Sequence, residues 1–298
     1  MKKLVFIIPY IGKLPKSFQL FLNSCGHNST IDFLLFIDDR TEFIYPLNVK
    51  VHYTNFDTLR QMVQRLYDFP ISLPRPYKFC DYRPAYGEIF SDWLNGYDFW
   101  GHCDLDLIWG DIRHFVTKEV LDSYDRIYTR GHCCLYRNTP AVNAWYRTLP
   151  SLGCQEWKAC FMSEKSRCYD EWSEHVGGGI SLIVHRNGIK CYDEIDMADL
   201  NRYVGYFEIP KRNMHHFALS YERGKLYAVK GDNKIELLCV HFQRRSLVLT
   251  KDSLGLLDYY INAPGVVEAF PKRHIVKEIL FTIDRFIKRI LRKLRIND

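Results

Sequence analysis

The first seventy residues alternate between short apolar runs and amphipathic stretches, and this order constrains the fold most. Apolar runs at 4–9, 31–37 and 49–53 predict buried strands, and the stretches at 17–25 and 58–67 predict helices. Strands that alternate with helices pair in parallel, because each helix carries the chain back to the start of the sheet. We therefore expect an α/β fold of Rossmann type, with a mainly parallel sheet flanked by helices.

The rest of the chain continues this mixture. We expect further strands at 97–100, 126–129 and 134–137, helices at 86–94, 140–149 and 180–186, and a hairpin of 226–229 with 235–240. The stretch 69–84 holds four prolines, which predicts a structured loop, and 150–175 predicts variable loops and helices around an acceptor. Ligands of parallel sheets bind at the carboxyl ends of the strands, where Pro9, Tyr10, Asp38 and Asp39 are expected.

Two carboxylates, Asp104 and Asp106, follow the apolar run 97–100. Side chains at i and i+2 of an extended chain point to the same side, so the pair can hold a hard divalent cation and leave positions for diphosphate oxygens. Such a cation would neutralise the charge that develops on a leaving nucleoside diphosphate. The two acids could instead only cap a turn, but their place directly after a strand favours a metal site.

His241 follows the last expected strand and is a suitable third ligand beside two carboxylates. Arg244, three residues further on, could face diphosphate oxygens, a geometry that a guanidinium group suits. The alternative for this segment is a surface histidine beside a basic turn.

The proline-rich loop carries Lys78, Asp81, Tyr82 and Arg83 within six residues. Tyr82, or Tyr86 just after it, can stack on a base, and Asp81 can accept a hydrogen bond from a base or a ribose. The same residues could equally form a well-packed connection with a local Asp–Arg pair.

Four segments together resemble a family of bacterial GT-A-fold glycosyltransferases found in capsule and lipopolysaccharide loci. They are Phe6–Tyr10, Lys78–Gly87, Gly96–Asp111 and His241–Gln243, within residues 1–245. The resemblance implies a UDP-sugar donor, with galactose the first choice of sugar, and Mn²⁺ or Mg²⁺ at Asp104 and Asp106 with His241 as third ligand. It also implies that Pro9, Tyr10, Asp38 and residues 81–83 lie near the nucleotide.

On this basis we expect a GT-A-like domain over 1–270, with a nucleotide-sugar and metal half at 1–115 and an acceptor half at 116–270. In enzymes of this fold that invert the anomeric centre, a carboxylate activates the acceptor hydroxyl as a general base. Asp170 and Glu171 are our candidates, with Glu174 as a third. A retaining reaction would need no base at that place.

The C-terminal segment 271–298 predicts a basic amphipathic helix. Apolar residues recur every three or four positions from Ile275 to Leu294, and nine Lys or Arg residues against three acids give 272–298 a charge of 9 − 3 = +6. The whole chain has a net charge of +6, so residues 1–271 sum to zero, which argues against a nucleic-acid enzyme with a basic face. The helix could lie on an anionic membrane beside a glycan or lipid-linked acceptor, or dock on the protein itself or on a second subunit.

The ten cysteines form no C-x-x-C pair, and no export signal is evident at Met1, so we expect reduced thiols in a cytoplasmic protein. With the basic C-terminal segment, we expect this protein at the inner face of the plasma membrane. Two alternative functions remain. The first is a metal-dependent phosphoesterase, which would need a larger cluster of acids and histidines to hold two metal ions. The second is a nucleic-acid-binding protein, which would use the basic C-terminal segment.

Overall fold

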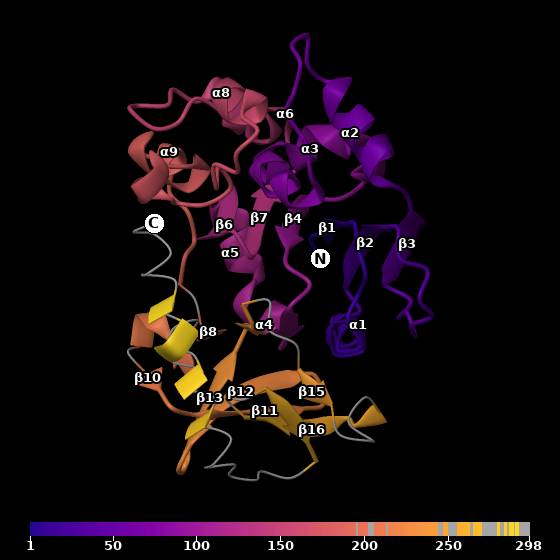
Figure 1. Cartoon of the computed structure of the whole chain (residues 1–298), viewed down its shortest axis with the longest axis vertical. Helices are drawn as coiled ribbons and strands as arrows, with labels where there is room; N and C mark the ends of the chain where they lie inside the picture. Colours follow the sequence, from indigo (N-terminus) through magenta and orange to yellow (C-terminus); the bar gives the residue numbers. More distant parts are fainter. Residues whose placement is uncertain are drawn as a thin grey trace. The chain divides into compact units, whose positions relative to one another are not determined.

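The computed structural model describes residues 1–194, 196–201, 206–212, 214–243, 247–249, 255–262, 265–269, 279–280, 283–284, 286–288 and 290–291. The chain forms two compact units (Figure 1). Unit 1 contains residues 1–14, 29–104 and 116–194, and unit 2 contains residues 15–28, 105–115 and 195–298. Each unit is thus assembled from three separate segments rather than from one continuous half.

Unit 1 is built on a six-stranded sheet in the order β3-β2-β1-β4-β7-β6. Its strands are β1 (Leu4–Tyr10), β2 (Ile31–Ile37), β3 (Val49–Tyr53), β4 (Phe99–Cys103), β6 (Arg126–Arg130) and β7 (Cys133–Arg137). The four strands from β3 to β4 run parallel, whereas β7 is antiparallel to both β4 and β6. The α/β fold class is confirmed, with a mixed sheet whose parallel part lies where the strand–helix alternation predicted it.

Most helices of unit 1 are shorter than the sequence pattern predicted. They are α2 (Phe56–Gln64), α3 (Tyr86–Ile89), α5 (Lys118–Ser123), α6 (Pro140–Asn143), α7 (Trp145–Thr148), α8 (Trp157–Met162) and α9 (Ile180–Arg186), with 3₁₀ turns η1 (Pro76–Ala85), η2 (Ser91–Trp93) and η3 (Glu174–Val176). Only the last expected helix, 180–186, has the predicted bounds. The expected helices at 86–94 and 140–149 are both broken, and much of the expected proline-rich loop is the 3₁₀ helix η1.

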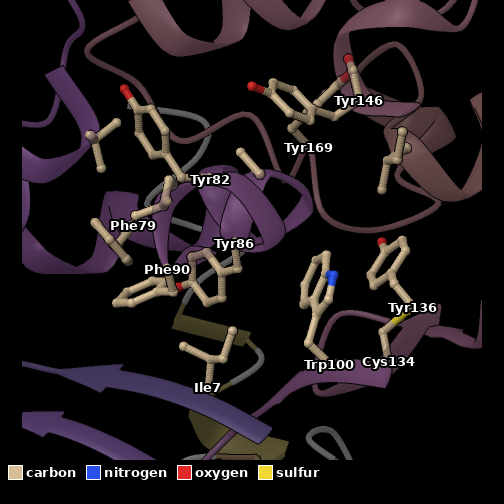
Figure 2. Packing of buried hydrophobic residues seen from close by; sticks show 14 of the residues in the cluster. Ile7, Phe79, Tyr82, Tyr86, Phe90, Trp100, Cys134, Tyr136, Tyr146 and Tyr169 are labelled. Carbon is tan, nitrogen blue, oxygen red and sulfur yellow. The ribbon is translucent and has the colours of Figure 1, made fainter. Parts of the chain in front are cut away.

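Aromatic side chains fill the core between the sheet and η1 (Figure 2). Trp100 stacks on Tyr136 with ring centroids 4.6 Å apart, and its indole nitrogen donates to Asn143 at 2.7 Å. Tyr82 and Tyr86 of the η1–α3 segment are buried in the same cluster. Tyr82 and Tyr86 therefore pack in the core of unit 1 as well as being candidates for a ligand site.

Unit 2 contains two further sheets and the helices α1 (Phe18–His27) and α4 (Ile112–Phe115), with a 3₁₀ turn η4 (Pro210–Arg212). One sheet has the order β10-β9-β8-β14-β5, from β5 (Leu107–Trp109), β8 (Met197–Leu200), β9 (Phe207–Ile209), β10 (Met214–His215) and β14 (Cys239–His241). The other has the order β13-β12-β11-β16-β17-β15, from β11 (Ala218–Glu222), β12 (Lys225–Lys230), β13 (Asn233–Leu237), β15 (Val248–Leu249), β16 (Asp258–Ile261) and β17 (Val266–Glu268). Most of these strands pair antiparallel.

The expected late hairpin is present as β12–β13, but its second strand ends at Leu237 rather than continuing to residue 240. The backbone N–H of Leu238 donates to the carbonyl of Asp196, and the chain then enters the other sheet as β14. This switch between sheets places His241 beside β5 and β8.

The described positions of the C-terminal segment are helical, as the repeat of apolar residues predicted. All seven apolar side chains described there are exposed, from 43% at Ile290 to 61% at Phe286. Lys288 pairs with Asp284 one turn away at 2.8 Å. Among the helices of the described residues, none has both the length and the apolar character needed to cross a bilayer.

All ten cysteines lie in the described part of the chain, and none of them forms a disulfide. Six of them are buried, including Cys103 and Cys239, and four are partly exposed.

Candidate active site

Three neighbouring parallel strands of unit 1 end at the same edge of the sheet. β1 ends at Tyr10, β2 leads into Asp38 and β4 leads directly into Asp104. Pro9 lies within β1, and the Tyr10 hydroxyl donates to the carbonyl of Lys13 at 3.3 Å. Asp38 accepts from the backbone N–H of Gly12 at 2.8 Å. The residues predicted to lie at the strand ends are therefore together at one edge.

Asp39 connects the turns that follow β1 and β2 through hydrogen bonds. Its carboxylate accepts from the backbone N–H of Leu14 at 2.8 Å and from the hydroxyl of Thr41 at 2.7 Å. These hydrogen bonds hold the pKa of Asp39 well below its usual range, so the group stays ionised. The turn after β1 is thereby fixed to the turn after β2.

Arg83 is the central cation of the site in unit 1. It donates to a carboxylate oxygen of Asp104, to Asp170 at 2.9 Å and to the carbonyl of Gly131 at 2.6 Å. Its burial would lower its pKa, but Asp104 and Asp170 raise it, and the net result is a pKa well above the usual value. The fold thus brings together three residues that the sequence singled out separately.

Asp170 and Glu171 are adjacent in sequence but lie in different environments. Asp170 is 2% exposed, and burial raises its pKa to about 7, although the Arg83 guanidinium acts in the opposite direction. A carboxyl group with a pKa near neutrality is able to exchange a proton at physiological pH. Glu171 is exposed, with the Ser173 hydroxyl 3.4 Å from one oxygen, and Glu174 is exposed in η3.

Lys78, Asp81 and Tyr82 are buried, and their polar groups bond to the protein. Lys78 and Asp81 form an ion pair of 2.5 Å with both side chains 0% exposed. Asp81 also accepts from the backbone N–H groups of Arg167 at 2.8 Å and Tyr169 at 3.0 Å. In this structure these residues anchor the segment that carries Asp170, and their contact with a nucleotide stays a prediction.

A second cluster lies within unit 2, where β14 is paired with β5 on one side and β8 on the other. His241 Nε2 faces Asp106 Oδ1 at 3.5 Å, and Nδ1 lies 2.9 Å from Asp199 Oδ1. The backbone N–H of Phe242 donates to the carbonyl of Asp106 at 2.9 Å, which holds the Asp106 backbone beside the end of β14. Asp199 was not among the predicted site residues; its one signal in the sequence is an acid within the otherwise apolar strand β8.

The donor atoms of this cluster fit a hard divalent cation. Carboxylate oxygen and imidazole nitrogen are suitable ligands for Mn²⁺, and neighbouring ligands of an octahedral ion lie about 3 Å apart. The 3.5 Å between Asp106 and His241 is close to that spacing. Only Leu105 separates Asp104 from Asp106 in the sequence. The length of the backbone therefore keeps their two Cα atoms within about 7 Å of each other. Arg244, the predicted diphosphate contact, lies outside the described residues.

Comparison with known proteins assigns the family. The model of a family of unknown function, DUF6625, matches residues 6–269. The chain belongs to the DUF6625 family. The matched part of this DUF6625 chain contains every site residue described above. A search of curated proteins with the DUF6625 chain finds no significant match.

Solved structures similar to the DUF6625 chain include the galactosyltransferase LgtC in complex with donor and acceptor sugar analogues. That match has 8% identity and a TM-score of 0.39 and covers 81% of this chain and 87% of LgtC. A structure of mouse xyloside xylosyltransferase 1 in its apo form matches with 9% identity and a TM-score of 0.37, covering 67% of this chain and 88% of the mouse protein. At such scores we assign no function to the DUF6625 chain from these likenesses.

Proposed function

We propose that this protein is a metal-dependent glycosyltransferase that moves a hexose from a UDP-sugar to a hydroxyl of a bacterial surface polysaccharide or lipopolysaccharide. The observation that carries the proposal is the position of Asp104. It directly follows a parallel strand, is paired with Arg83, and stands two residues before Asp106, an acid that faces a histidine. The resemblance of four sequence segments to GT-A enzymes supplies the donor class, with galactose as the first sugar to test.

Asp104, Asp106 and His241 would hold Mn²⁺ or Mg²⁺. When bound, the ion would act as a Lewis acid on the leaving nucleoside diphosphate. Pro9, Tyr10 and Asp38 lie at the strand ends, where a nucleotide binds in open α/β sheets. Arg83 supplies a permanent positive charge at the same edge, and Arg244 is the second cation that we propose for the diphosphate.

Asp170 and Glu171 are the proposed bases for the acceptor hydroxyl. Asp170 has the pKa near neutrality, whereas Glu171 has the exposed carboxylate that an acceptor can reach directly. Because their environments differ, substitution of each acid in turn can separate the two roles.

The exposed apolar residues and the +6 charge of 272–298 support a peripheral position on an anionic membrane, where a lipid-linked acceptor would be found. Each basic residue near such a surface contributes about 1 kcal/mol to binding. We propose the cytoplasmic leaflet as that surface.

A thermal-shift screen tests the function. The purified protein is heated with UDP, UDP-galactose, UDP-glucose and the matching guanosine nucleotides, each with and without Mn²⁺. A ligand at 100 times its Kd stabilises the folded state by about 2.7 kcal/mol, so the cognate nucleotide should raise the Tm only in the presence of the metal. Equal shifts for all nucleotides, or none for any, would contradict the proposal.

A further inference from the structure

The ring of His241 is held from the side opposite Asp106. β8 runs parallel to β14, and Asp199 is the register partner of His241, so the two side chains lie on the same face of the sheet. Asp199 Oδ1 is 2.9 Å from Nδ1 of the ring, while Nε2 faces Asp106 at 3.5 Å. The two ring nitrogens of His241 therefore face two different carboxylates.

The chemistry of the two groups decides which one donates in the 2.9 Å hydrogen bond between His241 and Asp199. An ionised carboxylate only accepts hydrogen bonds, so Nδ1 of His241 must carry the proton that Asp199 receives. A neutral imidazole has one N–H and one lone pair, which leaves the lone pair on Nε2 and aimed toward Asp106. A metal ligand requires that lone pair.

Gln243 fixes Asp199 in turn. Its side-chain amide donates to the same Asp199 oxygen at 3.1 Å. Gln243 has a φ of 52°, in the left-handed region, and so forms the turn that brings its side chain back beside β14. The amide nitrogen is also 3.3 Å from Nδ1 of His241, but two donors do not bond each other, so its hydrogen bond goes to Asp199.

From this arrangement we infer that Asp199 is a positioning residue for the proposed metal site, which sets the tautomer and the orientation of His241 so that Nε2 binds the divalent cation. The inference rests on the proposed function for the identity of the site but not for the hydrogen bonds that define it. Carboxylates that orient a metal-binding histidine in this way contribute typically about 10- to 100-fold to metal affinity.

The first measurement is Mn²⁺ affinity, obtained from the electron paramagnetic resonance of free Mn²⁺ in titrations of the whole chain without sugar nucleotide. Asp199→Ala and the more conservative Asp199→Asn should weaken Mn²⁺ binding about 10- to 100-fold. The matched control is Asp196→Ala, which removes an acid of the same segment whose carboxylate pairs with Arg212 at 2.7 Å and not with the histidine. This control should bind Mn²⁺ as the wild type does.

The second measurement is the tautomer of His241, read from ¹⁵N chemical shifts of labelled histidine in metal-free protein, with the signal assigned by its loss in His241→Ala. The wild type should show the Nδ1–H form, and Asp199→Ala should shift the ring toward Nε2–H, which a purely structural role of Asp199 would not do.

The outcomes separate the inference from the function. If Asp106→Ala and His241→Ala leave Mn²⁺ affinity unchanged, the proposed metal site is wrong, and the tautomer still decides the role of Asp199. If those two variants lose Mn²⁺ while Asp199→Ala binds it within twofold of wild type, or if the wild type shows Nε2–H, the inference about Asp199 is overturned.

Discussion

A single guanidinium group, that of Arg83, meets two carboxylates that lie far apart in the sequence. Asp104 is 21 residues from it and Asp170 is 87 residues from it, and both are bonded to its terminal nitrogens. A buried charge without partners is expensive, so this cation and Asp170 depend on each other. The same residue therefore links the proposed metal ligand Asp104 to a proposed base.

The metal site gives the first prediction at this scale. Asp106→Ala should abolish sugar transfer and leave the far-ultraviolet circular dichroism unchanged, because Asp106 lies in the bend just before β5 and is only partly buried. Mn²⁺ should tighten UDP binding in the wild type but not in the variant, as measured by calorimetry. Asp122→Ala, which removes an exposed acid of α5, serves as the control. Full activity of the wild type in excess chelator would refute the metal site.

The base gives the second prediction. A general base acts only in the transition state, so its loss should lower kcat by about 10²- to 10⁴-fold with little change in donor affinity. If Asp170 is the base, Asp170→Asn shows this loss, and wild-type kcat rises with pH through about 7, where its carboxyl group ionises. If Glu171→Gln shows the loss instead, Glu171 is the base. Normal turnover in both variants would leave a retaining mechanism or another base.

The raised pKa of Asp170 gives the third prediction, which concerns stability. Because the folded-state pKa is raised from 3.8 to about 7, the folded protein binds the proton more tightly than the unfolded chain. The stabilisation is complete below about pH 4 and is lost as the pH rises through about 7, with a total on the order of 4 kcal/mol. Asp170→Asn should lack this component when urea unfolding is compared at pH 5 and pH 8. Parallel pH dependence in both proteins would contradict it.

Among the elements, the start of α9 packs tightly against the segment 169–171 and so fixes the backbone that carries both candidate bases. The N–H of Ile180 donates to the carbonyl of Tyr169 at 2.7 Å and that of Ser181 to the carbonyl of Glu171 at 3.3 Å. A Cβ at Gly179 would lie 2.4 Å from the Glu171 carbonyl oxygen and 2.6 Å from that of Tyr169. The residue before α9 must therefore be a glycine for the 169–171 segment to lie against the helix.

The fourth prediction follows from this packing. Gly179→Ala should destabilise the protein by about 1–3 kcal/mol, because backbone carbonyls cannot move aside without shifting the segment. Gly131→Ala is the matched variant: the three atoms nearest to its Cβ would all belong to the Glu171 side chain, the first being Oε1 at 2.5 Å, and that side chain can rotate away. Gly131→Ala should retain the wild-type Tm and change only functions of Glu171. Equal Tm losses in the two variants would disprove the distinction.

The bounds of the helices and strands show how much of the fold could be predicted from the sequence. The strands 31–37 and 49–53 and the helix 180–186 have the predicted bounds, because each carries its own periodicity and end signals. β5 and β8 were not predicted, since three or four residues hold too little pattern and depend on β14 for their pairing. The Arg83–Asp170 contact and the role of Asp199 could not be predicted either, because both arise from residues more than 40 positions apart.

For the whole molecule, the charge is divided very unevenly along the chain. The segment 272–298 carries +6, equal to the net charge of the entire protein. At its described helical positions the apolar side chains are exposed, among them Leu280 at 60% and Leu291 at 52%. Apolar and basic groups in one helix favour an anionic lipid surface.

The fifth prediction is that deletion of 272–298 releases the protein from vesicles that contain an anionic lipid, in a sedimentation assay. High salt should weaken binding of the full chain, since the attraction is partly electrostatic. Transfer to a small water-soluble acceptor should survive the deletion. If the shortened protein unfolds, or the full chain ignores anionic vesicles, the helix belongs to the fold instead.

The interleaved construction of the two units has a consequence for how the protein is made. The chain passes between the units five times, after residues 14, 28, 104, 115 and 194. On the ribosome, α1 and β5 are therefore synthesised long before β14, which pairs with β5 and carries His241. A nascent chain that stalls before residue 239 lacks both β14, which joins β5 to β8, and the proposed histidine ligand. Under the proposed function, translation must pass His241 before a chain can hold the metal ion, so shorter fragments would leave the sugar donor unused.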